Sequence, residues 1–280
     1  MGIKLSSNNY GKSRVRLVRI TRGQMHDLKD ISLDIQLEGD FEEVYTRGDN
    51  RKVLPTDTMK NTVYALAAQT PVGEIEEFGQ HLAKYFLAEN PQVRNVRVAL
   101  NERLWSRIPV NGQPHPWAFV CGRPETRTAM VSATRTGSST QAGIENLLVL
   151  KSGESAFDGF IKDRYTTLPE TRDRIFATAV KASWSYVRHD VDYGRCWEGV
   201  HRVLLETFAQ HQSESVQHTL YAMAEAALDN FREVDAIRLS MPNRHHLPVN
   251  LEPLGLENRN EVFVATDEPH GLIEAVVRRE

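Results

Sequence analysis

The sequence predicts an α+β fold with two successive modules, each an antiparallel sheet with a pair of helices on one face. The first of three observations is that several segments alternate apolar and polar residues, as strands with one buried face do. In each half of the chain, two segments with the apolar spacing of amphipathic helices also follow each other. Between the halves, residues 135–143 are almost all polar and include two glycines, which is typical of an exposed loop. We therefore expect modules at residues 1–137 and 138–280.

The first half begins with two strands and continues with two helices. Residues 31–38 alternate four apolar with four polar side chains, and residues 13–20 also alternate, so we expect a hairpin that turns at residues 21–24. The apolar spacing changes to the helical period in residues 59–66 and again in residues 75–86.

Two more strands are expected before the central loop. Residues 96–100 alternate, the dipeptide Asn111-Gly112 predicts a tight turn, and residues 117–120 are rich in strand-forming side chains. The first half thus has the predicted order strand, strand, helix, helix, strand, strand.

The second half repeats this kind of order, although we find no residue-level identity between the halves. Helices are expected at residues 200–208 and 216–227. Strands are expected at residues 144–150, 182–186, 237–241, 261–264 and 272–277.

Composition argues against several classes of protein. The 280 residues are 40% hydrophobic and 25% charged, as in soluble globular proteins. A formal net charge of −3, without a long basic run, argues against a nucleic-acid partner. The N-terminus lacks an apolar run of signal-peptide length, no segment is apolar enough to span a membrane, and the C-terminus lacks a peroxisomal Ser-Lys-Leu. We expect a cytoplasmic protein with no membrane partner.

Lys12 and Thr56 are candidates for proton transfer. A hydroxyl carries protons usefully when a neighbouring amine or imidazole controls its protonation, and a buried lysine can do this. Each residue also has an ordinary explanation, because Lys12 could be a solvated charge and Thr56 could cap the following helix. A helix start favours a negative ligand, so the segment with Thr56 and Asp57 could serve both purposes.

Arg174 and Gln217 are candidates for recognising a planar heterocycle. A guanidinium fork and a side-chain amide together offer the donors and acceptors that the edge of an oxidised purine requires. Phe157 could stack on such a ring. The alternatives are a surface role for Arg174, an exposed first-turn position for Gln217, and core packing for Phe157.

Asn243 and His245 follow the strand expected at residues 237–241, where a loop could present them from a rigid support. The neighbouring pair His245-His246 raises the question of a metal site. No third ligand at a suitable spacing and no cysteine cluster supports one, and the isolated Cys121 and Cys196 read as reduced structural thiols. We expect no metal.

Six segments, in their order along the chain, resemble the urate oxidase (uricase) family. They are residues 10–12, 55–62, 157–160, 173–174, 215–217 and 242–245. The resemblance runs from about Tyr10 to Val277 and is most specific in residues 56–62, 165–171, 215–217 and 241–245. Asp158 and Arg172 depart from the family pattern, which has an aromatic residue at the first position and Trp at the second. Both adjoin site residues, so they bear on substrate affinity more than on the type of reaction.

The resemblance implies a tunnelling fold (T-fold), with two tandem modules that each have a four-stranded antiparallel sheet and a helix pair. In that family the sheets of several subunits join into a barrel, so it implies a homo-oligomer, expected to be a tetramer with active sites at subunit interfaces. It also implies oxidation of urate by O2 and water to 5-hydroxyisourate and H2O2 without a cofactor.

The resemblance also implies a role for each site residue. Arg174 and Gln217 would clamp the pyrimidine edge of urate while Phe157 stacks on its ring. The other polar atoms would meet the backbone N–H of Val216 and the segment of Thr56 and Asp57. The proton relay would be Lys12, Thr56 and His245, with its first two members from a neighbouring subunit, while Asn243 together with Thr56 would hold O2 or water.

Two other functions remain open at this stage. A T-fold enzyme that acts on pterins or GTP would anchor its heterocycle with a glutamate and often use zinc, and Gln217 argues against it. A non-catalytic purine-binding protein would keep the cradle without turnover, which the presence of Lys12, Thr56 and His245 disfavours.

Overall fold

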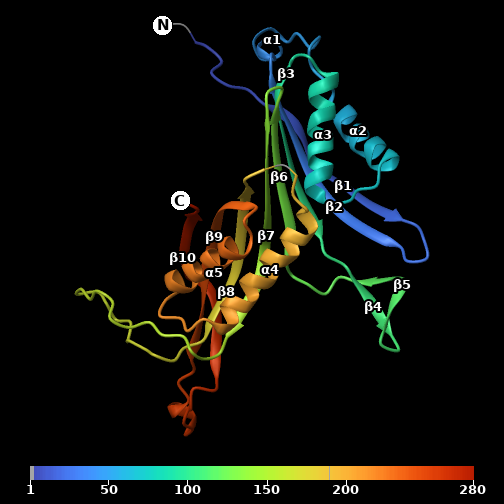
Figure 1. The fold of residues 1–280 in the computed structure, drawn as a ribbon. Coiled ribbons are helices and arrows are strands. Elements are labelled where there is room, and N and C mark those ends of the chain that lie inside the picture. The colour runs from blue at the N-terminus through green and yellow to red at the C-terminus, as the bar shows by residue number, and fades with distance from the viewer. Residues whose placement is uncertain (1–2, 189) are drawn as a thin grey trace. The chain divides into compact units, whose positions relative to one another are not determined.

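The computed structural model describes residues 3–188 and 190–280, which form two compact units (Figure 1). Unit 1 contains Met1–Gly143 and Arg188–Gly194, and unit 2 contains Ile144–Val187 and Arg195–Glu280. Strand β7 (Ser138–Lys151) contributes to both units, because the division falls between Gly143 and Ile144. The module boundary expected between residues 137 and 138 lies in the turn before this strand and stays a prediction.

Unit 1 has an antiparallel sheet with the strand order β1, β2, β3, β6, followed by the first residues of β7. These strands are β1 (Tyr10–Thr21), β2 (Asp27–Gly39), β3 (Val93–Arg103) and β6 (Thr126–Thr134). The helices are α1 (Glu42–Arg47), α2 (Thr56–Gln69) and α3 (Ile75–Glu89). A separate hairpin joins β4 (Ser106–Val110) to β5 (Gln113–Val120).

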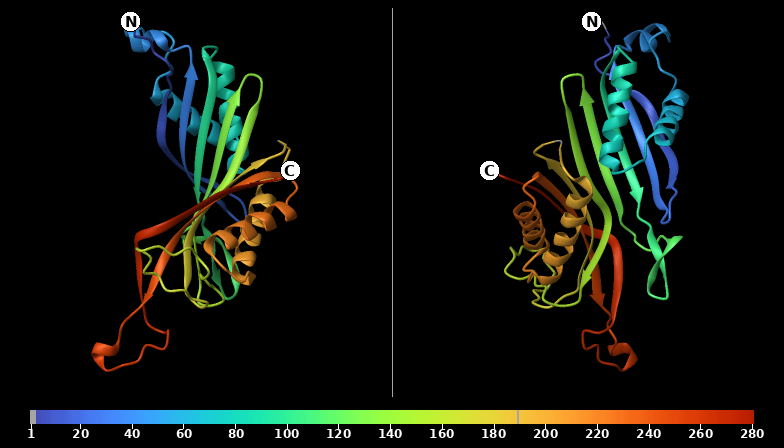
Figure 2. Two further views of the ribbon diagram at one scale, coloured as in Figure 1. Left: turned by 90° about the vertical axis from the view of Figure 1, so that its left-hand side faces the viewer. Right: turned by 45° about the vertical axis from the view of Figure 1, so that its right-hand side comes forward.

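One face of the unit 1 sheet is buried under α2 and α3, which lie on the same side of it in Figure 2. The odd-numbered residues of β2 from Ile31 to Leu37 are at most 1% exposed, because they point to these helices. Gly79 lets α3 come close to the sheet, since a Cβ there would lie 2.8 Å from the Leu100 side chain. The core of unit 1 therefore lies between helices and sheet, as the alternation predicts.

The expected hairpin of residues 13–20 and 31–38 and the two expected helices are confirmed. The prediction that residues 117–120 form the fourth strand of the sheet is wrong. They belong to β5 in the separate hairpin, which turns at Asn111-Gly112 with both φ angles positive. The fourth strand is β6, whose small Ala and Thr side chains gave too weak a pattern to be recognised.

Unit 2 has the antiparallel strand order β7, β8, β9, β10 and two helices that lie side by side in both views of Figure 2. The further bounds are β8 (Phe176–Tyr186), α4 (Tyr193–Gln210), α5 (Val216–Asn230), β9 (Val234–Pro248), the 3-10 helix η1 (Glu252–Leu254) and β10 (Phe263–Arg278). Helix α5 packs against β9 and β10, and Phe208 of α4 contacts Phe176 of β8 with ring centroids 5.2 Å apart. None of the helices in the described residues is long and apolar enough to cross a membrane.

The expectation that residues 138–143 form an exposed loop is wrong, because they begin β7. Thr140 and Ala142 are buried there, and small or hydroxylated side chains on that face hide the apolar alternation. Asn146 has φ 59°, and the buried positions change from even to odd numbers beyond it. Asn tolerates this left-handed conformation better than most residues, so it can shift the strand by one residue.

Strand β9 is longer than expected, so the prediction that Asn243 and His245 lie in a loop is wrong. Pairing with β10 continues through His245, which lies opposite Thr266. Pro242 has no N–H to donate, and the ladder to β8 skips it without ending. The two strands expected at residues 261–264 and 272–277 fall in one strand, β10, which begins at Phe263, after the first two residues of the first range, and is interrupted between Thr266 and Gly271.

A buried group of charges holds the start of α3 to the unit 1 sheet. Arg127 on β6 lies 2.7 Å from Glu76 Oε2 and 2.5 Å from Glu74 Oε2. Glu76 is fully buried, and burial raises its pKa despite the nearby guanidinium. One arginine therefore pairs with two carboxylates, of which Glu76 would otherwise be buried without a cation.

Arg127→Met should destabilise the protein by about 3–5 kcal/mol at neutral pH, because it leaves a buried carboxylate without a cation. The loss should shrink at acidic pH: the raised pKa of Glu76 means that the folded state binds its proton more tightly than the unfolded chain, and the protonated group carries no charge. Thermal unfolding at pH 5 and pH 8 tests this, with Arg97→Met on the exposed side of β3 as the control. Equal losses at both pH values would contradict it.

Candidate functional site

The residues predicted from the N-terminal half of the chain form what we call the N-terminal half-site: Lys12, Thr56 and Asp57, all in unit 1. Lys12 lies opposite Ile35 in the β1–β2 ladder, and Val15 lies opposite Leu33. The one-residue shift between these pairs is a bulge. Without the extra residue, Lys12 would point away from the helices; with it, Lys12 shares the helix-covered face with Val15.

The bulge is held by Arg14, which has φ 55° and whose backbone N–H donates to Asp34 Oδ1 at 2.6 Å. A positive φ is uncommon for a residue other than glycine, so the bulge is a built feature of the strand. It sets the direction of the Lys12 side chain.

The loop before α2 is fixed to the same strand. Tyr10 Oη accepts a hydrogen bond from the Leu54 N–H at 2.9 Å, and the Tyr10 ring packs edge-on against Phe41. Thr56 then begins α2, but it does not cap the helix: Pro55 occupies the cap position, without a side-chain cap bond. The expected alternative, a capping role for Thr56, is therefore wrong, and its hydroxyl accepts no capping hydrogen bond.

Asp57 connects Lys12 to the first turn of α2. The Asp57 carboxylate accepts from Lys60 Nζ at 2.5 Å and Asn61 Nδ2 at 3.2 Å. The hydrogen bond from Lys60 lowers the pKa of Asp57 most, and attraction to Lys12 lowers this pKa further. The charge of Lys12 thus acts on Asp57, which follows Thr56 in the first turn of α2.

The remaining predicted residues form the C-terminal half-site, all in unit 2: Phe157, Arg174, Val216, Gln217, Asn243 and His245. The segment of residues 154–157 links their elements. The Arg174 N–H donates to Ser155 O at 3.0 Å, and the Ala156 N–H donates to Ser213 O at 2.7 Å, two residues before the cap of α5. Phe157 pairs with Thr171 through two backbone hydrogen bonds. These contacts bring Phe157, Arg174 and the start of α5 together.

Arg174 is a half-buried cation without a counterion. Its Cζ lies 5.3 Å from the centroid of the Phe157 ring, and its Nε is buried with no hydrogen-bond partner in the described parts of the chain. No ion pair between described residues involves it. Burial lowers the pKa of Arg174. A buried donor without an acceptor is costly, so this guanidinium is suited to a ligand with acceptor atoms in one plane.

Helix α5 packs against β9, the strand that carries Asn243. Ser215 caps the helix by accepting from the His218 N–H at 3.1 Å, so Val216 and Gln217 are its first residues. The helix returns along β9, and its 15 residues span about 22 Å, or about seven strand residues from Val234. Gln217 is exposed and Val216 is buried. Counted from Val234, seven residues reach Met241, two residues before Asn243.

His245 lies in a pocket of about 480 Å³ on unit 2, which also includes Arg244, His246, Thr266 and Asp267. Asp267 Oδ1 lies 3.6 Å from the Arg244 guanidinium. Searching residues 3–188 and 190–280 gives no group of three or more His, Cys, Asp or Glu side chains that could hold a metal ion.

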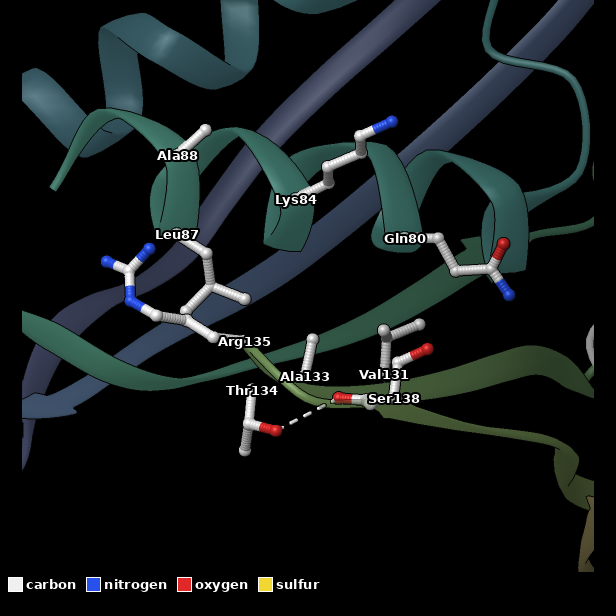
Figure 3. A pocket seen from close by; sticks show the side chains of 10 residues that line it. Gln80, Lys84, Leu87, Ala88, Val131, Ala133, Thr134, Arg135 and Ser138 are labelled. Carbon is white, nitrogen blue, oxygen red and sulfur yellow. Dashed lines mark hydrogen bonds between the residues drawn. The ribbon is translucent and has the colours of Figure 1, made fainter. Parts of the chain in front are cut away.

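A pocket of similar size in unit 1 contains no predicted site residue. Gln80, Lys84 and Leu87 of α3 line it together with Val131 and other residues of β6 and β7. Figure 3 shows Lys84 pointing away from its floor, with Gln80 and Arg135 at opposite ends. Arg135 donates to the carbonyls of Asn90, Pro91 and Val93. The polar groups do not converge, so this pocket lacks the arrangement of a ligand site.

A model of the uricase family matches residues 8–132 and 140–274. The chain belongs to the uricase family. It is 44% identical to the uricase of Arthrobacter globiformis over 279 residues, and this alignment covers 99% of this chain and 91% of that protein. It is 40% identical over 280 residues to the uricase of Dictyostelium discoideum, with 98% and 97% covered. The crystal structure of the A. globiformis uricase superposes with a TM-score of 0.95 at 44% identity, covering 100% of this chain and 96% of that one.

Family membership confirms the resemblance to uricases. It also confirms the uricase fold, which is α+β with two tandem repeats and a large antiparallel sheet. The roles assigned to individual uricase residues stay predictions. The structure links Phe157, Arg174 and the start of α5 through backbone hydrogen bonds, and it places His245 in a pocket whose lining includes neither Phe157 nor Arg174.

The two departures from the uricase pattern lie next to each other. Arg172 Nε donates to Asp158 Oδ2 at 2.9 Å, so the acidic and basic replacements form an ion pair beside Phe157. Arg172 is 89% exposed and Asp158 is 31% exposed. Next to the pair, the Phe157 ring stacks on the Phe160 ring with centroids 4.8 Å apart.

Sequence reasoning missed the buried hydroxyls of unit 2. Ser155, Thr178, Ser213 and Thr219 are fully buried, and Thr178 lies opposite Asn243 in the β8–β9 ladder. The sequence held one signal, because Thr219 stands on the apolar side of α5 with Val216, Leu220 and Met223. A polar residue at such a position needs a partner.

The Asp158–Arg172 pair should contribute about 0.2–1 kcal/mol to stability, because both side chains reach solvent. A double-mutant cycle with Asp158→Asn and Arg172→Gln, followed by thermal unfolding at low and high salt, measures this coupling. Arg202→Gln and Glu206→Gln, an exposed pair on α4, are the control. A coupling above about 2 kcal/mol would show that the pair orders the whole segment of residues 158–172.

Proposed function

We propose that this protein is a urate oxidase, which converts urate, O2 and water to 5-hydroxyisourate and H2O2. The observation that carries the proposal is the half-buried Arg174 guanidinium, which has no counterion among the described residues, lies over an aromatic ring, and belongs to a segment tied by backbone hydrogen bonds to the start of α5. The uricase family supports the same reaction. It does not favour the alternatives of a non-catalytic purine-binding protein or an enzyme acting on pterins or GTP.

The C-terminal half-site would bind the ring. Arg174 would donate to the oxygen and nitrogen acceptors on the pyrimidine edge of urate, and the Gln217 amide would pair with that edge from α5. Phe157 would stack on the flat ring, and the Val216 N–H would bind a further acceptor. A urate anion would also supply the negative charge that Arg174 lacks.

The N-terminal half-site and His245 would move protons. Lys12 would control the protonation of the Thr56 hydroxyl, and His245 would continue the proton relay. Asp57 would bind polar atoms of the ring. Thr56 and Asn243 would hold O2 or water against its face. Deprotonated urate is electron-rich enough to pass two electrons to O2, so the protein need only remove protons and align reactants. Water then supplies the hydroxyl oxygen of the product, and no cofactor or metal is required.

The relay includes residues of both units, and we propose that a homo-oligomer, expected to be a tetramer, completes each site. Strands β1 and β10 end the strand orders of their units and carry exposed apolar side chains: Val18, Ile20, Val264, Leu272 and Val276. Long, apolar edge strands invite pairing with another chain. Lys12 and Thr56 of one subunit would then meet Arg174 of another. The cytoplasmic location stays a prediction.

Purified, chelator-treated protein should consume urate in air and release one H2O2 per urate. Loss of ultraviolet absorbance and a coupled peroxide assay measure both quantities. Tight urate binding without turnover would instead support the non-catalytic protein. The absence of both binding and turnover would contradict the proposal.

The two half-sites should fail differently when they are changed. Lys12→Met and Thr56→Ala should lower kcat by about 100-fold or more, because they remove proton transfer, with smaller effects on KM. Arg174→Ala and Gln217→Ala should raise KM, by roughly tenfold or more for Arg174, because they remove contacts to the bound ring. Lys60→Met, which removes the other cation beside Asp57, is the control for Lys12. The same fall in kcat together with the same rise in KM in all four variants would contradict the division of roles.

A further inference from the structure

A chain of buried hydroxyls lies behind the first turn of α5 and takes no part in the mechanism above. Thr219 Oγ1 donates to Ser213 Oγ at 2.8 Å, and Ser213 Oγ donates to Ser215 O at 3.1 Å. His211 Nδ1 lies 3.2 Å from Thr219 Oγ1. Ser213 and Thr219 are both fully buried. The chain thus runs from an imidazole ring to the residue that caps α5.

The carbonyl at one end determines where every hydrogen lies. A carbonyl oxygen only accepts, so Ser213 uses its hydroxyl hydrogen on Ser215 and can only accept from Thr219. Thr219 in turn uses its hydrogen on Ser213 and must accept from His211. The three contacts are therefore all satisfied only when His211 carries a hydrogen on Nδ1.

The surroundings of His211 disfavour its protonated, charged form. Burial lowers its pKa most, and His218 and Lys151 lower it further, against the opposite effect of Glu214. The rings of His211 and His218 are 4.3 Å apart, and Lys151 Nζ donates to the His211 carbonyl at 2.6 Å. A neutral imidazole has one N–H, and the hydroxyl chain places it on Nδ1.

Ser213 also anchors the other side of the C-terminal half-site. Its N–H donates to Glu154 O at 3.0 Å, and its carbonyl accepts from the Ala156 N–H at 2.7 Å. These bonds hold the segment that leads to Phe157, and Ser155 O accepts the Arg174 N–H. One residue therefore ties the backbone beside Phe157 and Arg174 to the cap of α5.

We infer that Ser213 and Thr219, ordered by His211, are positioning residues. They set the spacing between the two sides of the cradle, with Arg174 and Phe157 on one side and Val216 and Gln217 on the other. They touch no substrate. Their hydroxyls fix the first turn of α5 against residues 154–157, so that both sides of the cradle fit one flat purine ring. The identity of that ring rests on the proposed function, whereas the fixed spacing rests on the hydrogen bonds alone.

Thr219→Val tests the inference, because it keeps the side-chain shape and removes the hydroxyl. It leaves the His211 Nδ1–H without an acceptor and removes the hydrogen bond that Ser213 Oγ accepts, so KM for urate should rise about tenfold while kcat stays within about twofold. Thr219→Ser should restore KM. Thr140→Val is the matched control, because Thr140 is a buried threonine of unit 1 that accepts from Gln80, and its loss should leave KM unchanged.

A second readout does not depend on urate. Hydrogen exchange of the backbone N–H groups in residues 154–157 and 216–219 should be faster in Thr219→Val than in the intact wild-type oligomer, and unchanged there in Thr140→Val. If wild type neither binds nor oxidises urate but this exchange effect is found, the proposed function fails while the positioning role stands.

Two results would overturn the inference. One is a Thr219→Val enzyme that turns over urate with wild-type KM and shows wild-type exchange in both segments. The other is nitrogen NMR of His211 that finds the neutral ring protonated on Nε2. Should Thr219→Val not fold, Ser213→Ala breaks the chain at its bonds to Thr219 and Ser215, keeps the backbone bonds of residue 213, and must also raise KM.

Discussion

Each sheet has to bury one face under helices, and this constraint determines the side on which every strand residue lies. In β2 the apolar residues from Ile31 to Leu37 occupy alternate positions and all face α2 and α3. Once that face is fixed, a neighbouring strand can place a side chain on the helix side only at every second residue. A shift in the regular pairing moves a side chain from one side of the sheet to the other.

The candidate site residues lie close to such changes. The bulge at Arg14 brings Lys12 to the helix side of β1. In unit 2, Pro242 interrupts the ladder from β9 to β8 directly before Asn243. Residues 154–157 are joined to the rest of the unit by isolated bridges in place of a full strand. Irregular pairing costs stability, but it allows polar groups to project where regular strands would place apolar ones.

Two buried or half-buried arginines show how the same side chain serves structure or binding. Arg127 is compensated within its own unit by Glu74 and Glu76, so its charge stabilises the contact between α3 and the sheet. Arg174 has an aromatic ring and a helix start near it, with an orphaned Nε. The first arrangement is complete without a ligand. The second leaves a donor for one, and the hydroxyls of Ser213 and Thr219 hold the surrounding backbone in place.

The sequence by itself determined the elements with strong periodicity. The β1–β2 hairpin, α2, α3 and α5 were predictable because one apolar face runs through each of them, and the motif segments identified the family and the candidate residues. Tertiary structure decided the rest. Whether residues 117–120 or 126–134 complete a sheet, whether residues 138–143 form a loop, and whether Asn243 lies in a strand all depend on pairing with distant strands. So do the tautomer of His211 and the missing counterion of Arg174, because hydrogen bonds and burial depend on neighbours that sequence spacing does not reveal.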